Sequence, residues 1–301
     1  MREGYLVLGL GIISSSLSFA QVKKQFSIDN VQTVERVDLD FAVNSGSCVI
    51  KPGQTDEILT VYGNQNYDSY SHSFNKETIG NTCKVNLVLE DDKSSGLSSS
   101  ISYRMFGKSE AVSDKIWKLF LSEDKTYDLN LKYGIGKADI DLSGLAVEKI
   151  KISTGSADIN VGYLTGTYNR VPMDTFYVKV DLGSIKVQNL NLSKSKHVIA
   201  DIGFGDLLLD FSNKSEVSSN IRGSVGAGNL VIVLPHDNTP VIVKINNSWL
   251  CNVKMTKSLK NIGDNTFVNS TYTADADNLL SFTLDVSMGN IIFKDGSSSS
   301  K

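Results

Sequence analysis

A five-residue pattern recurs along the chain and constrains its fold more than any other feature. The pattern is a glycine, a small or polar residue, an apolar residue, any residue and a second apolar residue. In the central part its glycines follow one another at intervals of 19 residues, from Gly136 to Gly155, up to 28 residues, from Gly155 to Gly183. Periods in this range are typical of repeat proteins, in which each unit buries its apolar face only against its neighbours. The pattern begins at Gly46, Gly136, Gly155, Gly183, Gly205, Gly228 and Gly289.

Each unit is expected to be a strand unit. Apolar side chains occupy every second position, as at Ala138, Ile140 and Leu142, and the residues between them are Asp. A period of two indicates a β-strand with one buried face. The glycine that opens each pattern is explained by a turn that needs a positive φ, or by a close approach between neighbouring units. The chain is therefore predicted to be all-β, with strand units stacked on one another.

Other stretches qualify this picture. A weak helical pattern covers 113–121, around Trp117. The run Leu230–Leu234 is apolar in both phases, which predicts a central strand covered on both faces. Between 54 and 128 the pattern loosens, and we predict an irregular, insertion-rich part there within a single domain over 21–295. The Ser-rich tail, 296–301, is predicted to be disordered.

The first twenty residues are typical of an export signal. In MREGYLVLGLGIISSSLSFA, Arg2 precedes an apolar run, and small residues stand at Ser18 and Ala20, the positions that a signal peptidase reads. We interpret 1–20 as a cleaved signal peptide, the alternative being an uncleaved anchor. No later stretch is apolar for long enough to span a bilayer. The mature chain is therefore expected outside the cytoplasm, in the periplasm or at the cell surface, without a transmembrane anchor.

Charge and cysteine content limit the partners and the redox chemistry. A net charge of -3 supplies no basic field, so nucleic acid is not an expected partner. Outside the cytoplasm a disulfide is permitted, and Cys48 and Cys83 both lie in the inward phase of strand-like runs. A bridge between them and two buried free thiols both remain open.

The stretch VYGNQNYDSYSHSF allows two interpretations. It contains Tyr62, Tyr67, Tyr70 and Phe74 among Asn and Ser residues. It is either a solvated hairpin at the end of the stack or a recognition surface, since adaptable binding loops use these residue types.

No pattern predicts a catalytic or cofactor site. Three Gly-x-Gly pairs lack the third glycine and the following helix of a dinucleotide site. The histidines, His72, His197 and His236, are scattered, and the chain has neither a nucleophile elbow nor a metal-ligand spacing. We therefore expect a non-enzymatic protein without a cofactor.

The acidic residues on the outward face are the one charged cluster that the sequence indicates. Asp139 and Asp141 are expected to stack over Asp158 of the next unit, which calls for a cation or a lysine between them. Calcium and neighbouring lysines such as Lys137 are the two alternatives for that role.

Several segments together carry a family resemblance. The segment YDLNLKYGIGKADIDLSGLAVEKIKISTGSADINV, the later SVGAGNLVIVLPHDNTPVIVKI and the closing SMGNIIF resemble the bacterial toast-rack domain. This domain occurs in LiaF-like cell-envelope stress proteins and in secreted adhesin-like proteins of unknown function. The resemblance implies a single-stranded, right-handed β-solenoid without an assigned catalytic site. The chain lacks the several N-terminal membrane helices of the LiaF-like proteins.

From these features we expect a cell-surface binding or adhesin-like module whose partner is an envelope protein or a glycan. The alternative is a periplasmic envelope-stress or structural component. A carbohydrate-processing enzyme is a minor alternative, because other β-helical folds include such enzymes. Association into a homo-oligomer is left open.

Overall fold

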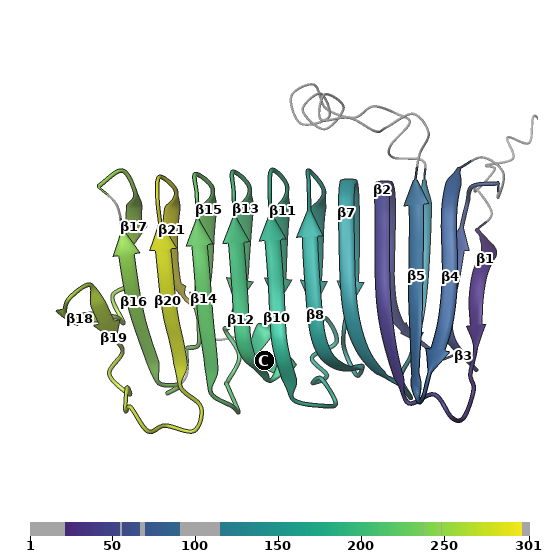
Figure 1. Ribbon diagram of the computed structural model, residues 1–301. Coiled ribbons are helices and arrows are strands. Elements are labelled where there is room, and N and C mark those ends of the chain that lie inside the picture. Colours follow the sequence, from purple (N-terminus) through teal and green to yellow (C-terminus); the bar gives the residue numbers. More distant parts are fainter. Residues whose placement is uncertain are drawn as a thin grey trace, which may run out of the picture.

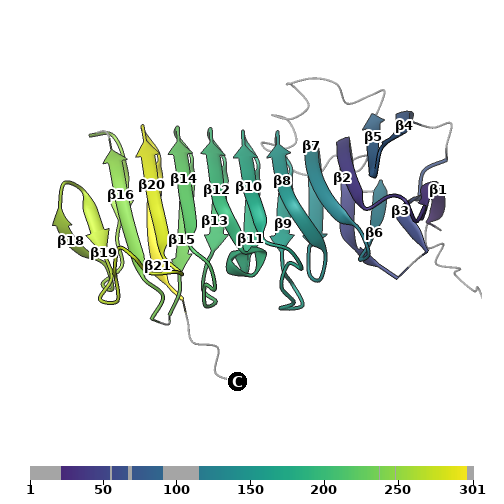
Figure 2. The same cartoon turned by 60° about the horizontal axis from the view of Figure 1, so that its bottom comes forward.

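The chain folds into a rack of parallel rungs, each made of one strand from each of two facing sheets (Figure 1). The computed structural model describes residues 22–54, 56–66, 70–90, 115–236, 238–247 and 249–296. In a typical rung the chain ascends through one sheet, which we call sheet I, turns, and descends through the other, sheet II. Longer connections at the opposite edge lead to the next rung (Figure 2).

Sheet I runs along the whole rack. From the N-terminal to the C-terminal end of the rack it consists of β4 (Ser71–Ile79), β5 (Thr82–Glu90), the first half of β2 (Arg36–Gly53), the first half of β7 (Thr126–Asp141), β8 (Ala146–Thr154), β10 (Met173–Val180), β12 (Ser195–Ile202), β14 (Ser219–Val225), β20 (Leu280–Val286), β16 (Val241–Asn247), β19 (Thr266–Val268) and β18 (Lys260–Gly263).

Sheet II lies opposite and is joined to sheet I because β2 and β7 continue through both. In the same direction it consists of β1 (Lys23–Asp29), β3 (Glu57–Gly63), β6 (Ile116–Ser122), the second halves of β2 and β7, β9 (Asp158–Gly162), β11 (Ser184–Gln188), β13 (Asp206–Asp210), β15 (Asn229–Leu234), β21 (Asn290–Asp295) and β17 (Asn252–Lys254). The described residues also include one short 3-10 helix, η2 (Leu190–Ser193).

The order of rungs follows the sequence in the middle of the rack but not at its ends. In space, β2 lies between β7 on one side and β5 and β6 on the other. In the sequence, β5 and β6 instead lie between β2 and β7. At the far end, β20 and β21 are inserted between β14–β15 and β16–β17. Antiparallel strands close the ends of sheet I, β4 at one and β18–β19 at the other.

The core lies between the two sheets. Strands alternate buried and more exposed residues, as in β13, where Leu207 and Leu209 are buried. The predicted alternation is therefore confirmed. β15 is a central strand, as predicted, with β13 and β21 on either side. The expectation that it is covered on both faces is wrong: Val231 and Val233 are only half-buried, because sheet II has no further layer outside it.

Glycines at the sheet-to-sheet turns are required by the stacking. In β7, Gly136 has φ +121°, and a Cβ there would lie 2.1 Å from the carbonyl oxygen of Gly46 in β2. At Gly228, a Cβ would lie 2.2 Å from the carbonyl oxygen of Gly205. Both explanations given for these glycines, a positive φ and a close approach, hold.

Two expectations about the N-terminal half differ from the structure. The weak helical pattern around Trp117 corresponds to β6, a strand that pairs in parallel with β2. Its outward residues contact neighbouring strands while Trp117 packs inward, so tertiary packing overrides the local pattern. Within the part predicted to be irregular, 54–128, residues 55, 67–69 and 91–114 lie outside the described residues, and the described residues include the regular strands β3, β4, β5 and β6.

Candidate functional site

The aromatic residues of the tyrosine-rich stretch do not form one surface. Tyr62 faces outward from β3, with its ring 5.7 Å from that of Phe120. Tyr70 is buried, and its ring lies 4.8 Å from that of Trp117. Phe74 is half-buried and packs against Phe26, with ring centroids 5.0 Å apart. Tyr70 and Phe74 thus close the N-terminal end of the core, while Tyr62 belongs to the outer face of sheet II.

The remaining residue of that prediction, Tyr67, lies outside the described residues.

Cys48 and Cys83 are buried free thiols. Cys83 of β5 lies beside Val37, whereas Cys48 stands further along β2, beside Trp117. The structure thus does not bring Cys48 and Cys83 together, and the alternative of buried free thiols describes them. Burial raises the pKa of the Cys48 thiol to about 12.

The acidic residues expected to stack are placed differently. Asp158 lies beside Lys137 of the previous rung, and Asp139 lies beside Asn160, which donates a hydrogen bond to it at 3.0 Å. The expected stack of Asp139 and Asp141 over Asp158 is therefore wrong. Within the described ranges, no group of three His, Cys, Asp or Glu residues is arranged to hold a metal ion.

A groove with a volume of about 650 Å³ lies on the outer face of sheet I. It crosses β2, β7, β8 and β10, and we call it the sheet I groove. Apart from Asp174, its polar lining residues form two rows across these strands, because outward residues of paired strands stand side by side. One row consists of Asp38, Asp128, Lys149 and Thr175, and the other of Asp40, Asn130, Lys151 and Tyr177.

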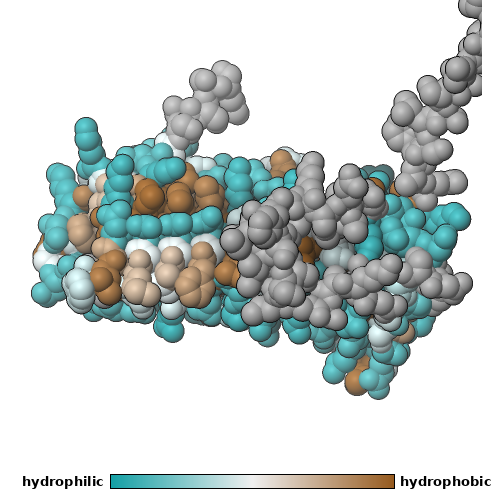
Figure 3. All heavy atoms as spheres, turned by 90° about the horizontal axis from the view of Figure 1, so that it is seen from above, coloured by the Kyte–Doolittle hydropathy of each residue, from teal (hydrophilic) through white to brown (hydrophobic). Residues whose placement is uncertain are grey.

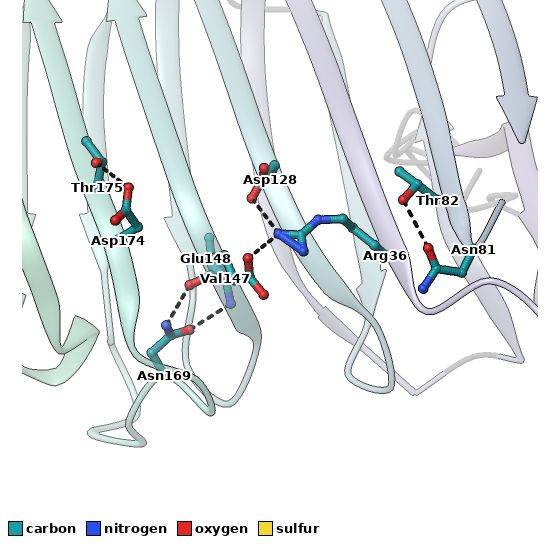
Figure 4. A network of polar contacts seen from close by, with 9 residues as sticks. All are labelled: Arg36, Asn81, Thr82, Asp128, Val147, Glu148, Asn169, Asp174 and Thr175. Atoms are coloured by element: carbon teal, nitrogen blue, oxygen red, sulfur yellow. Dashed lines mark hydrogen bonds and ion pairs between the residues drawn. The ribbon is translucent and has the colours of Figure 1, made fainter. Parts of the chain in front are cut away.

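Arg36 organises the lower end of this groove (Figure 4). Its guanidinium pairs with Glu148 and lies 3.7 Å from Asp128 Oδ1. Close by, the buried Asn169 receives a hydrogen bond from the amide of Val147 at 2.9 Å and donates one to its carbonyl at 2.7 Å. These contacts fix the loop after β9 against β8 and hold Arg36 beside the first acidic row.

Burial governs the electrostatics of Asp128. Partial burial raises the pKa of its carboxyl group, and the nearby Arg36 and Lys149 only partly oppose this shift. Asp38, directly beside it on β2, raises the pKa further. The first row is thus a close pair of carboxylates flanked by cations.

The second row ends in a tyrosine that is held in place. The hydroxyl of Tyr177 donates a hydrogen bond to Asp201 at 2.6 Å. Lys151 Nζ lies 5.2 Å from the centre of its ring. Burial and the contact with Asp201 raise the pKa of Tyr177 to about 12, so the phenol stays protonated. At the other end of this row, Asn130 donates a hydrogen bond to Asp40.

The groove was not identified from the sequence, although one signal pointed to it. The segments VDLDFAV, at 37–43, and YDLNLKY, at 127–133, share the pattern of an acid, Leu and a second polar residue. In the structure these segments pair residue by residue, which brings their polar side chains together. The groove can bind a ligand through several hydrogen-bond acceptors and through two ammonium groups that lie beside an aromatic ring.

Comparison with known proteins identifies the family. Residues 18–183 match the family model of the N-terminal domain of toast_rack (DUF2154), so the chain belongs to this family. This confirms the resemblance noted in the sequence. The all-β rack agrees with it. No curated protein sequence matches the chain.

One solved structure is similar in outline. It is described as a "putative cell adhesion protein" from Clostridium sporogenes ATCC 15579, with 16% sequence identity and a TM-score of 0.42. The match covers 91% of this chain and 100% of that one. No helix among the described residues is long and apolar enough to cross a membrane.

Proposed function

We propose that the protein is a non-catalytic binding module of the cell envelope that holds a glycan in the sheet I groove. The observation that carries this proposal is the groove itself, where two rows of polar groups run side by side and one of them ends at the fixed ring of Tyr177. Glycan sites commonly combine an aromatic surface with side chains that bind hydroxyl groups, and concave surfaces with a few fixed polar groups are typical ligand sites.

The charge of the groove narrows the ligand class. Its lining includes four carboxylates, Asp38, Asp40, Asp128 and Asp174, and two lysines. An excess of negative charge repels uronic acids and sulfated sugars and favours neutral sugars or amino sugars. We therefore expect oligosaccharides of glucosamine type to bind better than acidic ones.

A binding role also fits the arrangement of the acidic residues. Asp38 and Asp128 stand beside each other on neighbouring strands, in one flat row, and do not face each other across the groove. A glycosidase instead needs two carboxyl groups on opposite sides of the bond that breaks.

We also propose that the protein is exported, because residues 1–20 have the pattern of a signal peptide.

Titration calorimetry with three soluble probes tests the proposal. The probes are a chitosan oligosaccharide, a neutral dextran and an acidic alginate, each added to the purified protein. We expect heat with chitosan or dextran, weak or no heat with alginate, and about a fivefold or greater loss of affinity in Tyr177→Ala, since stacking of this kind contributes about 1 kcal/mol or more. Absence of binding to all three probes would contradict the proposal.

A matched variant separates the groove from the rest of sheet I. Lys151 and Lys244 occupy the same outward row, but only Lys151 lines the groove. Lys151→Ala should weaken binding, whereas Lys244→Ala should leave it unchanged. Equal effects of both substitutions would mean that the glycan binds elsewhere on the sheet.

A further inference from the structure

The edge of the rack formed by the sheet I to sheet II turns carries a row of apolar side chains. Each turn is hydrogen-bonded to the one before it: the amides of Phe204, Ala227 and Met288 each donate to a carbonyl of the preceding turn at 2.8 Å. Turns on neighbouring rungs therefore lie about 4.8 Å apart. Seen from above, apolar side chains follow this edge over the C-terminal rungs (Figure 3). The turn ridge, as we call it, takes one residue from each of four adjacent rungs: Leu182, Phe204, Ala227 and Met288.

Two side chains of the ridge project far into solvent. Phe204 is 71% exposed and Met288 58%, whereas Leu182 is half-buried. Single exposed apolar residues are ordinary, but a contiguous row of them with a polar rim marks an interaction surface. The kind of partner that covers the ridge then depends on the charge of its rim and on the spacing of its side chains.

The rim of the ridge is acidic on both sheets. Asp201 and Asp285 belong to one outward row of sheet I, and Asp206 stands on sheet II, two residues after Phe204. Asp181 lies in the first turn of the ridge and pairs at 3.2 Å with Lys179. In the sequence, Lys179 is the one cation within three residues of any ridge position.

Neutral groups hold the acidic rim in place. Asp206 accepts a hydrogen bond from the side-chain amide of Asn229 at 2.6 Å. Asp285 accepts one from the side-chain amide of Asn246 at 2.8 Å. These donors fix the carboxylates without cancelling their charge. A partner that suits the ridge is therefore apolar along its centre and basic along both sides.

The spacing of the ridge selects the form of the partner. One ridge residue stands on each rung, about every 4.8 Å. An α-helix presents its apolar stripe once per turn, about every 5.4 Å, so that after three steps it is out of step by only about 2 Å. An extended strand presents side chains on one face about every 6.7 Å and is out of step by about 6 Å at the same point. A helix thus matches all four rungs, and a strand does not.

We propose that the turn ridge is the docking site of a basic amphipathic helix of a partner protein. The apolar stripe of the helix lies along the ridge, and its lysines or arginines face the carboxylates of the rim. A helix of about three turns covers the four rungs. The site ends at Met288, because the strands beside the next turn, β16 and β17, carry Lys244 and Lys254. This inference goes beyond the proposed glycan binding and does not depend on it.

Titration calorimetry with two synthetic peptides tests the inference. Both are stapled into a helix of four turns and carry leucine at every third or fourth position, and the residues beside this stripe are lysine in one peptide and glutamate in the other. We expect the lysine peptide to bind, more weakly as salt is added, and the glutamate peptide not to bind. No binding of the lysine peptide, or equal binding of both peptides, overturns the inference.

Variants of the ridge and of its rim give the decisive result. Phe204→Ala should weaken binding of the lysine peptide at least about tenfold, because it removes a large apolar contact. The double variant Asp206→Lys, Asp285→Lys should reverse the preference, so that the glutamate peptide binds better. Unchanged affinity in folded Phe204→Ala, or an unchanged preference in the folded double variant, overturns the inference.

A control variant checks that the effect is specific. Ile262, on β18, is 60% exposed and lies outside the ridge. Ile262→Ala should bind the lysine peptide like the unchanged protein. Loss of binding in this variant would overturn the inference, since the peptide would then bind exposed apolar surface in general.

A second copy of the chain and a lipid surface are the competing occupants of the ridge. Sedimentation velocity of the protein alone tests the first, and co-sedimentation with vesicles of phosphatidylcholine and of phosphatidylglycerol tests the second. We expect neither self-association nor vesicle binding through the ridge, because its acidic rim repels both another acidic rim and anionic lipid. Self-association or vesicle binding that Phe204→Ala abolishes would overturn the inference.

Discussion

The middle of the rack and its two ends are built by different rules. From β8 to β15 each rung contacts the rung before and after it in the sequence, and all pairs are parallel. At the ends, β2 and the β20–β21 rung are inserted out of order, and antiparallel strands cover the last rungs. The middle can thus grow by local contacts, whereas the ends join segments that are far apart in the chain.

This difference has a consequence for stability. In a simple stack each rung adds its own stability and that of its contacts with its neighbours. The inserted rungs connect the chain ends to the interior, so the last strands in the sequence are interior strands in space. We therefore expect the strands at the ends of the chain to contribute more to stability than the strands at the ends of the rack.

The largest effect is expected from removing the inserted rung. Truncation before Leu280 removes β20 and β21, which leaves β14–β15 and β16–β17 without their shared neighbour. We expect this chain not to fold cooperatively, as measured by a thermal melt followed by circular dichroism. Replacing 260–268, the strands β18 and β19, by a short Gly/Ser linker removes only the cover of sheet I and should lower Tm by on the order of 5 °C.

If both variants melted alike, the inserted rung would be no more important than the cover, and the comparison between chain ends and rack ends would fail.

Intermediate effects are expected from the turn glycines. Gly228→Ala places a Cβ 2.2 Å from the carbonyl oxygen of Gly205, and neither backbone can move without disturbing a rung. We expect it to lower the free energy of unfolding by about 3 kcal/mol or more, measured by urea denaturation. Gly80, in the end hairpin, has φ +63° and no atom within 4 Å of an added Cβ. Gly80→Ala should cost only about 1–2 kcal/mol, the cost of a left-handed backbone.

Equal costs at Gly80 and Gly228 would mean that the close approach between rungs is not what requires glycine at position 228, since Gly228 has no positive φ.

The smallest effects are expected from two carboxyl groups with opposite pKa shifts. Asp128, in the middle of sheet I, has a raised pKa, so the folded state holds its proton more tightly and stability falls as pH rises above the ordinary value. Glu57, at the end, pairs with Lys24 and has a lowered pKa, so its contribution is present at neutral pH and is lost as pH falls.

Urea denaturation at pH 3 to 7 distinguishes the two groups. Asp128→Asn should keep or slightly raise the stability at pH 7. It should also remove the loss of stability that accompanies rising pH in the unchanged protein. Glu57→Gln should slightly lower the stability at pH 7 and have less effect in acid. The opposite sign for either variant would show that the burial of Asp128, or the ion pair of Glu57, does not govern its titration.

The sequence pattern predicted the strands of the middle rungs well but misjudged their alignment. The segments GKADI and GSADI suggest that Ala138 aligns with Ala157, yet in the structure Ala138 lies beside Ile159. A shift of two residues keeps every inward side chain inward, so alternation cannot distinguish the two alignments. The expected stack of acids was wrong for this reason.

The candidate sites were predictable only in part. Tyr62 was identified from residue type, but Phe120 and Lys51, which line the same hollow on the outer face of sheet II, come from segments that no local pattern connects. The sheet I groove needs β2 beside β7, although β3, β4, β5 and β6 lie between them in the sequence.

The sequence by itself determined the class of structure, the inward face of the middle strands and the need for glycine at the turns. These properties depend on the two-residue period of apolar side chains and on the backbone conformation of single residues. Both are local features of the sequence. Only the tertiary structure decided which rung lies beside which, and in what alignment. Strands of similar pattern can pair with many partners, and the choice among them rests on how the whole core packs.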